Sequence, residues 1–550
     1  MLFVYFLGLS IAATAARNSF GPGAADVSVH PTDVYAEFSL SGFRDAAASV
    51  MNQTVATLQV GARSTALGLK QNSALEAWRN AELILGSDAI SLPSPEPARS
   101  RNNDIVFSGK SASALNQVLA AARSANVEVL TDVLAIDQPI EIGNSGIHLD
   151  LGNTRLVGGP SRGFMLRIEG ATNIVLSGGN FSAGDSAILV SRSSNVTVDN
   201  TAISGISGAG IVLTDASAAR ITRNRISGTP LAGIVVHRQT LNTVVDHNAV
   251  AGVRGFSNLM AGIVLTDREV DITNDPRALL GPSGFWVVEQ PMSQRMHPPH
   301  DNLIAWNQIS ASSASGIYSD GGIRNVIYGN SIAGSSKEGL CLDNGSAANV
   351  VASNDIEGNG RRVGEPDTVL ALDSVLAGGR LADGTPAAKL PGISLDNTIY
   401  DVVFANNIVH NFGGGIKFVR TGYFNAIGLN TLFDNNDGAS ANFHYFGIEL
   451  GAAPGDAAST ELDFTPSRGD ILFSNNIRGN HYSGIFMGAG SDQNTIVYNT
   501  IFDATNWALE SVARMQNQSL NNLTTLPSRN IGSGLDAALI ASGQPVDDAR

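Results

Sequence analysis

The sequence is poor in the residues on which several common kinds of protein depend. Cys341 is the only cysteine among 550 residues, which excludes an intramolecular disulfide framework and a metal site built from several cysteines. Aromatic residues make up 6% of the chain and charged residues 15%, whereas glycine occurs 59 times. Many glycines with few charges suit a fold of short strands and tight turns, and suit a helical bundle badly. The composition therefore favours an all-β fold.

Basic residues are also scarce. The chain has 34 Lys and Arg against 49 Asp and Glu, which gives a formal net charge of −15. Binding to nucleic acid depends on clustered Lys and Arg that neutralise phosphates, so we expect no nucleic-acid partner. A strongly acidic polymer is disfavoured too, unless a metal ion or a local basic patch intervenes.

The one long apolar run stands at the start of the chain. Residues 1–16 are apolar and end in small residues that are typical of a signal-peptide cleavage site, although no Lys or Arg precedes the run. The run is too short to span a bilayer. We therefore expect a signal peptide over 1–16, a periplasmic or secreted protein, and no integral membrane segment in the mature chain. The alternative is an ordinary buried segment.

The rest of the chain divides by its patterns. Residues 17–101 are interpreted as a partly helical N-terminal extension and linker, of no assigned role. Residues 102–125 contain apolar residues at helical spacing after a Ser, which predicts a helix that caps the open end of a solenoid. Residues 126–512 carry an internal repeat, and residues 513–550 are interpreted as a C-terminal tail.

The repeat has two landmarks and a period of about 24 residues. The first is an Asn followed two residues later by an aliphatic residue, at Asn224, Asn248, Asn307, Asn330, Asn354, Asn406, Asn430, Asn475 and Asn499. The second is a Gly before an aliphatic residue, at Gly210, Gly233, Gly262, Gly316, Gly339, Gly392, Gly415, Gly447 and Gly484. Short strands in such units can stack in parallel at about 4.8 Å per unit. We expect the Asn column to occupy turns with left-handed backbone and to form an amide ladder.

The pattern N-x-I followed by G-I-x-L resembles the repeat of the pectin-lyase-like superfold. This superfold includes pectate lyases, polygalacturonases, mannuronan epimerases and NosD-type periplasmic proteins. The resemblance implies a single-stranded right-handed parallel β-helix, with an N-terminal helical cap, over about residues 126–512. It also implies that a site would lie over the sheet of G-I-x-L strands. Because the superfold hosts many activities as well as non-catalytic proteins, the function has to be argued from the site.

Two columns of side chains should point outward from the G-I-x-L strands, because successive residues of a strand face opposite sides. The first column contains Val212, Val235, Val264, Tyr318, Cys341, Ser394, Lys417, Glu449 and Phe486. The second contains Thr214, His237, Thr266, Asp320, Asp343, Asp396, Val419, Gly451 and Gly488. These strands are flanked on both sides by insertions, which are residues 267–301, 359–391, 435–446 and 451–469. Insertions on both sides of a strand column predict a cleft between them.

The aspartates are the first candidate group. Neighbours among Asp320, Asp343 and Asp396 should lie about 5 Å apart, which is close to the separation of a retaining glycosidase pair. Like charges nearby raise the pKa of a carboxyl group, so that it can keep its proton and serve as a general acid. The alternative is a ladder of Asp-Asn turns without catalytic meaning.

Two further groups stand near them. Lys417 and Arg420 with Glu449 could neutralise a uronate and abstract its proton, or could form an ion pair between turns. The pairs at 444–445 and 481–482, each His then Tyr, should stack at the edge of the cleft. A His base with a Tyr acid suits β-elimination or C5 epimerisation, and the rings also suit sugar binding or simple edge packing.

The sequence thus predicts an exported protein that binds a polysaccharide or oligosaccharide and cleaves its glycosidic bonds by hydrolysis. The alternatives are a polysaccharide lyase or C5 epimerase acting on uronates, and a non-catalytic binding or structural solenoid. The predicted catalytic residues are Asp343, Asp396, Lys417 and Glu449. The predicted substrate-binding residues are Tyr318, Asp320, Arg420, His444, Tyr445, His481 and Tyr482. No metal ligand is assigned and no cofactor is firmly implied, with Ca²⁺ on the aspartates left open. The sugar, the linkage and the oligomeric state are not indicated.

Overall fold

The computed structural model describes residues 104–530, apart from residues 160–162, 256, 281–296, 361–389, 420–421, 436–445, 452–466, 480–481, 489–490, 505, 512–516, 521 and 525–527. The chain divides into two units, residues 1–54 and 55–550, and every described residue belongs to the second. The predicted signal peptide and N-terminal extension lie outside the described residues, as does the tail from residue 531 on.

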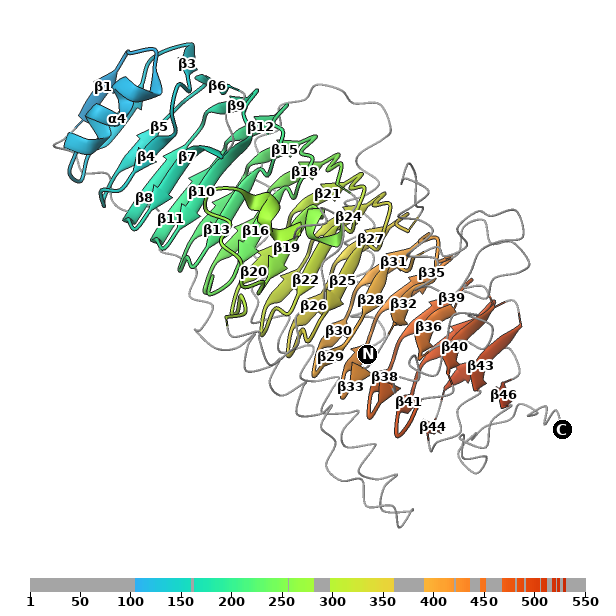
Figure 1. Ribbon diagram of the computed structural model, residues 1–550. Coiled ribbons are helices and arrows are strands. Elements are labelled where there is room, and N and C mark those ends of the chain that lie inside the picture. The colour runs from blue at the N-terminus through green and yellow to red at the C-terminus, as the bar shows by residue number, and fades with distance from the viewer. Residues whose placement is uncertain are drawn as a thin grey trace, which may run out of the picture. The chain divides into compact units, whose positions relative to one another are not determined.

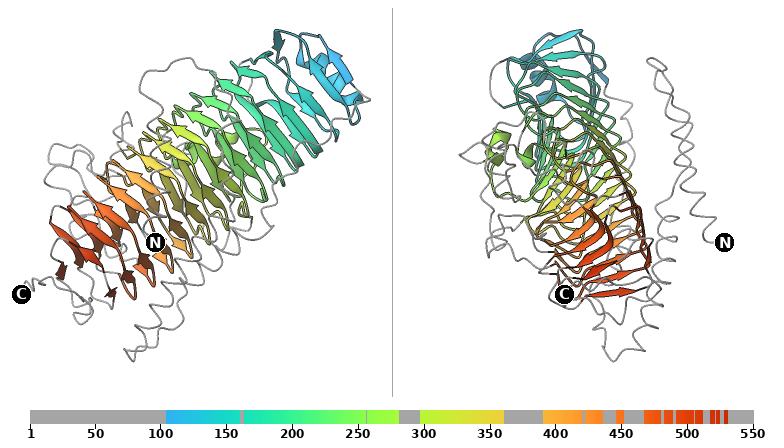
Figure 2. Two further views of the ribbon diagram at one scale, coloured as in Figure 1. Left: turned by 180° about the vertical axis from the view of Figure 1, so that it is seen from behind. Right: turned by 90° about the vertical axis from the view of Figure 1, so that its right-hand side faces the viewer.

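The described chain passes again and again through three sheets in the same order, and every strand pair is parallel (Figures 1 and 2). Sheet A consists of β1 (Asp104–Phe107), β2 (Asn126–Val129), β5 (His148–Asp150), β8 (Thr172–Ser177), β11 (Ser194–Asp199), β14 (Arg220–Thr222), β17 (Val244–Asp246), β20 (Leu303–Ala305), β23 (Val326–Tyr328), β26 (Val350–Ala352), β30 (Val402–Phe404), β34 (Ala426–Gly428), β38 (Ile471–Phe473), β41 (Thr495–Val497) and β44 (Gln518–Leu520).

Sheet B follows sheet A in each turn. It consists of β3 (Val133–Ala135), β6 (Arg155–Val157), β9 (Asn180–Ser182), β12 (Ala202–Ser204), β15 (Arg225–Ser227), β18 (Ala249–Ala251), β21 (Gln308–Ser310), β24 (Ser331–Ala333), β27 (Asp355–Glu357), β31 (Asn407–Val409), β35 (Thr431–Phe433), β39 (Asn476–Arg478), β42 (Thr500–Phe502) and β45 (Leu523–Thr524).

Sheet C contains the strands that follow the Gly landmark. It consists of β4 (Ile140–Ile142), β7 (Phe164–Glu169), β10 (Ser186–Ser191), β13 (Ile211–Thr214), β16 (Ile234–His237), β19 (Ile263–Thr266), β22 (Ile317–Asp320), β25 (Leu340–Asp343), β28 (Ile393–Leu395), β32 (Ile416–Phe418), β36 (Phe446–Leu450), β40 (Ser483–Met487), β43 (Trp507–Ser511) and β46 (Arg529–Asn530). A small sheet of β29 (Thr398–Ile399), β33 (Gly422–Tyr423) and β37 (Ser467–Arg468) lies between sheets C and A.

The interior is a continuous stack of aliphatic side chains. Each turn sends residues from all three sheets inward, as Ile304 of β20, Ile309 of β21 and Ile317 of β22 do, and all three belong to one buried cluster. Alternation of inward and outward residues along each strand gives this arrangement directly. The parallel β-helix predicted from the repeat is confirmed.

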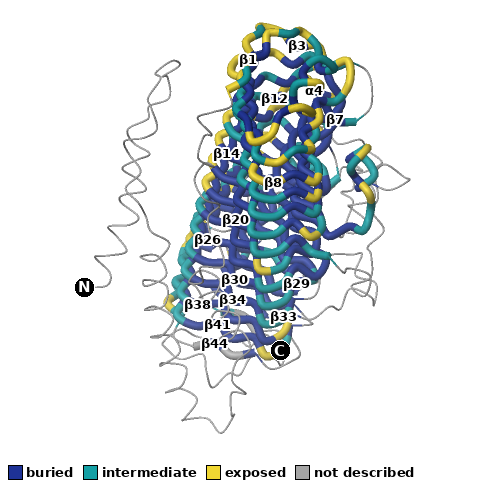
Figure 3. Tube along the Cα trace, turned by 90° about the vertical axis from the view of Figure 1, so that its left-hand side faces the viewer, coloured by how far each residue is buried: buried dark blue, intermediate teal, exposed yellow. Residues whose placement is uncertain are grey.

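Helix α4 (Ala112–Ala121) closes the N-terminal end (Figure 1). Its N-cap is Ser111, whose hydroxyl accepts a hydrogen bond from the amide of Ala114, and Leu115 and Leu119 are buried against the first turns. This confirms the predicted helical cap. Exposed residues are gathered around these first turns, whereas later turns are largely buried (Figure 3). No helix among the described residues is long and apolar enough to cross a membrane.

The predicted Asn column is a buried amide ladder. In Asn330, both the backbone amide and the side-chain Nδ2 donate to Oδ1 of Asn354 at 2.9 Å, and Nδ2 also donates to the carbonyl of Ile304 at 2.8 Å. The expected left-handed backbone falls one residue earlier, at positions such as Trp306 (φ 53°) and Ser353 (φ 54°), and not on the asparagines. The asparagines satisfy the backbone groups that these turns leave open.

A second ladder runs along the turn between sheets C and A, and two of its members are aspartates. Its members are Asn302, Asn325, Asn349, Asp401, Asn425, Asp470, Asn494 and Asn517. From Asn302 to Asn494 each member is followed two residues later by an aliphatic residue, so this ladder has the same sequence signal as the first, but only one such position per unit was aligned.

The Gly column reflects close packing of neighbouring turns. A Cβ atom on Gly316 would lie 2.7 Å from the carbonyl oxygen of Gly339, and would also overlap Ile332 of sheet B. A Cβ atom on Gly339 would lie 2.9 Å from the carbonyl oxygen of Gly392. Glycine is required here because there is no room for a side chain, and not because of positive φ.

Candidate functional site

The two predicted outward columns are present on sheet C in the predicted register. Tyr318, Cys341, Ser394, Lys417 and Glu449 are successive Cα partners on β22, β25, β28, β32 and β36. Asp320 pairs with Asp343 in the second column, and Asp396 follows directly after Leu395, the partner of Leu342. We call these eight residues the polar strip: Tyr318, Asp320, Cys341, Asp343, Ser394, Asp396, Lys417 and Glu449.

A tyrosine orients one of the aspartates in the strip. The hydroxyl of Tyr318 donates to Oδ2 of Asp343 at 2.8 Å, and the backbone amide of Asn344 donates to Oδ1 at 2.6 Å. Burial and the charge of Asp343 raise the pKa of Tyr318 well above its usual value, so the phenol keeps its proton and remains a donor. Two donors on its oxygens suit an ionised Asp343 carboxylate in a fixed orientation.

Cys341 is buried in the first outward column, between Tyr318 and Ser394 on the neighbouring strands. Burial raises the pKa of Cys341 well above its usual value, and the negative charges of Glu338, Asp343 and Asp396 raise it further. The thiol therefore stays protonated. Glu338 was missed by the sequence analysis. The sequence does distinguish Glu338, because no other Gly landmark is directly preceded by a charged residue.

Lys417 and Glu449 form an ion pair across neighbouring turns. The Lys417 Nζ atom lies 3.3 Å from Oε2 of Glu449, and their side chains are 28% and 7% exposed. The pair brings together two predicted catalytic residues, next to Ser394 and the aspartates. A half-buried cation beside buried carboxylates can balance their charge, or can contact an anionic group of a ligand.

Asp320 is engaged by the protein itself. It is fully buried, and its Oδ2 accepts hydrogen bonds from Arg268 Nε at 2.8 Å and Thr266 Oγ1 at 3.0 Å. Its Oδ1 accepts from Asn344 Nδ2 at 2.7 Å. Asp320 therefore holds Arg268, the second residue of an insertion, against sheet C.

His237 holds the same insertion. Its Nε2 lies 2.7 Å from the carbonyl oxygen of Arg268, so this nitrogen donates, and its Nδ1 accepts from the hydroxyl of Thr214 at 2.9 Å. Burial lowers the pKa of His237 to about 4, which keeps the ring neutral near pH 7. Neither His237 nor Arg268 was identified from the sequence as a polar anchor.

Residues 267–280 of this insertion cover sheet C instead of rising beside it. Ile272 and the 3-10 helix η3 (Pro276–Leu280) belong to a hydrophobic cluster with Val212, Val235 and Val264 of the first column, and η2 (Asn258–Met260) contributes to its edge (Figure 1, green). The guanidinium of Arg277 pairs with Asp185 at 2.5 Å. The insertion thus buries the apolar part of the column, and the same cluster extends to Tyr318 and Cys341 of the polar strip.

Several predicted features fall outside the described residues. They include Arg420, His444, Tyr445 and His481, and most of the insertions at 359–391, 435–446 and 451–469. The predicted cleft between insertions on both sides therefore remains a prediction. Tyr482 is described, and its ring packs edge-on against Phe446 with centroids 6.2 Å apart.

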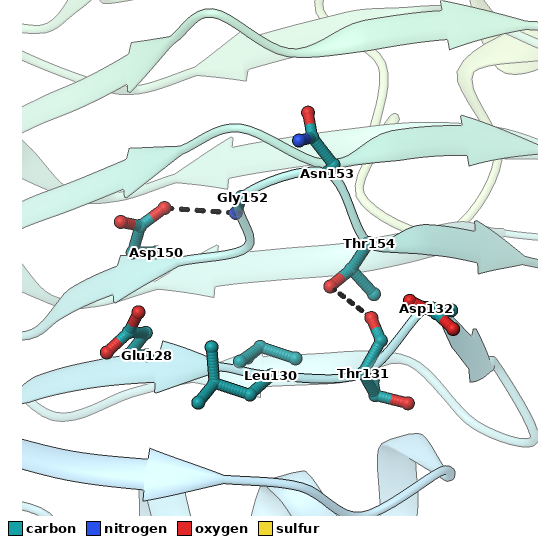
Figure 4. A pocket seen from close by; sticks show the side chains of 9 residues that line it. Glu128, Leu130, Thr131, Asp132, Asp150, Gly152, Asn153 and Thr154 are labelled. Atoms are coloured by element: carbon teal, nitrogen blue, oxygen red, sulfur yellow. Dashed lines mark hydrogen bonds between the residues drawn. The ribbon is translucent and has the colours of Figure 1, made fainter.

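A separate hollow of about 380 Å³ lies on the first turns, far along the sheets from the polar strip. Its lining includes the carboxylates of Glu128, Asp132 and Asp150. Two of the lining side chains make hydrogen bonds with the backbone of the hollow itself: Oδ1 of Asp150 accepts from the amide of Gly152, and the hydroxyl of Thr154 donates to the carbonyl of Thr131 (Figure 4). Within the described ranges, no group of three or more His, Cys, Asp or Glu residues has the arrangement of a metal site.

The sequence matches the model of the right-handed beta helix region over residues 138–275 and 296–451, which together make up more than half of the chain. The chain belongs to the right-handed β-helix family. The matched range of this β-helix protein includes the whole polar strip.

Solved structures are similar to this β-helix protein in fold. The catalytic domain of a GH87 alpha-1,3-glucanase in complex with nigerose is 13% identical with a TM-score of 0.50, and the match covers 75% of this chain and 70% of that one. The catalytic unit of a GH87 alpha-1,3-glucanase from Streptomyces thermodiastaticus strain HF3-3 is 13% identical, with a TM-score of 0.40 and coverage of 82% and 73%. The periplasmic alginate epimerase AlgG is 14% identical, with a TM-score of 0.36 and coverage of 70% and 78%. No curated protein matches the sequence significantly.

The different roles of two aspartates lead to a first prediction. Replacing Asp320 by Asn removes the counter-ion of buried Arg268 and should lower the free energy of unfolding by about 3 kcal/mol. Asp343→Asn is the matched control, because two neutral donors, the Tyr318 hydroxyl and the Asn344 amide, hold its carboxylate. Thermal melting followed by circular dichroism should show a clear fall for Asp320→Asn and a smaller one for Asp343→Asn. Equal melting of the two variants would contradict the structural role of Asp320.

Proposed function

We propose that this protein is exported, that it binds a polysaccharide over the polar strip of sheet C, and that it cleaves glycosidic bonds by hydrolysis. The observation that carries the proposal is the register of sheet C, which sets Asp343 and Asp396 on neighbouring turns, with the oxygens of Asp343 held by Tyr318 and Asn344. Glycoside hydrolysis needs two carboxyl groups on either side of the scissile bond. A stack of rigid strands can hold such groups at fixed separations.

The division of roles follows from the contacts. Asp343, with its oxygens fixed by Tyr318 and Asn344, is suited to act as an ionised nucleophile or base. Asp396 lies one turn away, at about 5 Å along the stack, a separation that favours a retaining mechanism. Glu338 is a second candidate for the acid. The solved glucanase whose fold is similar binds nigerose, which supports a sugar polymer as the ligand class.

The pair of Lys417 and Glu449 supports the alternative of elimination or C5 epimerisation. Lys417 could neutralise a uronate carboxylate, and a base on the other side of the ring could abstract the C5 proton. His444 and Tyr445 are the candidates for that base from the sequence. Hydrolysis is preferred because several carboxylates near the strip disfavour an anionic polymer.

A panel of neutral and uronate-containing polysaccharides tests the proposal. Hydrolysis should release reducing ends without absorbance of unsaturated products, whereas elimination should yield both. Binding without either product would indicate C5 epimerisation or a non-catalytic solenoid. Absence of binding to every member of the panel, for a protein with a normal melting transition, would count against the proposed function.

A further inference from the structure

The outer face of sheet A changes its character along the solenoid. On β11 and β14 the outward residues are polar, for example Thr197, Asp199 and Arg220. From β20 to β38 the equivalent column is wholly apolar: Leu303, Val326, Val350, Val402, Ala426 and Ile471. The neighbouring outward column contributes Ala352, Phe404 and Phe473 on the same strands. We call these nine residues the apolar stripe.

The apolar stripe is buried although it points away from the interior. Its members are no more than 1% exposed, and they lie along the dark face of β20 to β38 in Figure 3. Neither the interior cluster nor the cluster beneath residues 267–280 contains any of them. Covering a face of this kind removes a large apolar area from water, which stabilises the contact. A covering segment with an apolar face of its own is therefore required.

One segment outside the described residues has the pattern that this face needs. Residues 73–85 read SALEAWRNAELIL, with Ser73 and Glu76 spaced as a capping box at the start of a helix. Within the predicted helix, one arc of about 120° holds only apolar residues, and the opposite side holds mainly polar ones. The apolar arc consists of Ala74, Ala77, Trp78, Ala81, Ile84 and Leu85.

The length of the predicted helix also agrees with the length of the apolar stripe. A helix of this size is about 20 Å long, and the five steps from β20 to β38 in sheet A extend about 24 Å. The linker from residue 86 to residue 103 can reach about 60 Å when extended. The far end of the stripe, β38, is twelve strand steps from β1, or about 58 Å. The linker is thus long enough to bring the helix onto any part of the stripe.

We propose that residues 73–85 form an amphipathic helix that docks on the apolar stripe. Each turn of a solenoid otherwise contacts only its neighbours, so a helix laid along the stack ties together turns that do not touch one another. The same turns of the solenoid contain the sheet C strands β22 to β36, which carry the polar strip. The docked helix therefore braces the turns of the candidate site through another sheet, sheet A.

Protection of an introduced thiol tests the docking. In the full-length chain, Ala352→Cys places a thiol in the middle of the stripe, and buried Cys341 alone provides the unreactive baseline. We expect labelling by a maleimide at a rate close to that baseline. Adding Trp78→Asp, which puts a charge on the docking face, should increase the rate at least tenfold. The matched control Asn80→Asp puts the same residue on the polar side of the helix and should leave the rate unchanged.

Two further variants make the outcome decisive. Thr197→Cys places a thiol on the polar part of sheet A and should label quickly in every background. Trp78→Asp combined with Ala81→Asp should release the helix if one charge is tolerated, and circular dichroism checks that the solenoid persists. Rapid labelling with native Trp78, or full protection in the double Asp variant, would overturn the proposal. The second result would assign the stripe to another segment or to a second copy of the chain.

Discussion

Asp343→Asn and Asp396→Asn should each reduce the rate of polysaccharide cleavage by at least a hundredfold while the solenoid remains folded. Asn preserves the shape of the side chain and most of its hydrogen bonds, so a purely structural aspartate would tolerate the change. A catalytic carboxylate would not, because Asn can neither attack the anomeric carbon nor transfer a proton. The rate of product release and the melting temperature should be measured for both variants on one responsive polysaccharide.

Lys417→Ala separates hydrolysis from elimination. Under hydrolysis we expect a modest loss of activity, because Lys417 balances the charge of Glu449 and does not contact the scissile bond. Activity that survives in both Asn variants and disappears in Lys417→Ala would assign the site to elimination. Full activity in all three variants would exclude a catalytic role for this face of sheet C.

The repeat made the solenoid predictable because backbone geometry determines it locally. Alternation along each strand places every second residue inward, and a repeat of about 24 residues stacks equivalent residues on one another. The register of Tyr318, Cys341, Ser394, Lys417 and Glu449 could therefore be predicted from the Gly landmark alone, and the structure confirms it. The left-handed residue was predicted one position too late. The prediction rested on the tendency of Asn to adopt a left-handed backbone, whereas the column asparagines are needed for their side-chain hydrogen bonds.

The path of the insertion at 267–280 could not be predicted in the same way. It is set by contacts between distant residues, such as Arg277 with Asp185, which are 92 positions apart. A pattern within one turn contains no information about such a pair. The roles of Asp320 and Arg268 follow from this path, and so does the burial of Val212 and its neighbours. Glu338 could not be found among the outward positions after the Gly landmark, because it stands directly before Gly339.

The two aspartates in the second ladder should make the stability of the solenoid depend on pH. Asp401 accepts hydrogen bonds from the amide and Nδ2 of Asn349, and Asp470 accepts from Asn425 and from the hydroxyl of Ser467. Burial raises the pKa of both carboxyl groups from 3.8 to about 7. Asn349, Asn425, Asn494 and Ser467, which face them in the ladder, are all uncharged, so the protonated forms are favoured by burial alone.

The sign of the effect follows from linkage. Below pH 3.8 both folded and unfolded chains hold these protons, and the stability is at its full value. Between pH 3.8 and about 7 only the folded chain holds them, so raising the pH favours unfolding by about 1.4 kcal/mol per pH unit and site. Each aspartate should cost roughly 4 kcal/mol by pH 8, where both forms are ionised. The wild-type melting temperature should therefore fall between pH 5 and pH 8.

Asp401→Asn with Asp470→Asn should remove most of this fall and raise the melting temperature at pH 8, with little change at pH 5. The amide of Asn needs no proton, and its Nδ2 can donate within the ladder as the native asparagines do. The reverse change, Asn406→Asp in the first ladder, is the matched control and should steepen the fall, because Asn406 is equally buried and bonded to Asn354 and Asn430. Melting curves at pH 5 and pH 8 for the three proteins decide the matter. A wild type and a double Asn variant with the same pH dependence would show that both aspartates are already ionised, and that the ladder tolerates buried charge.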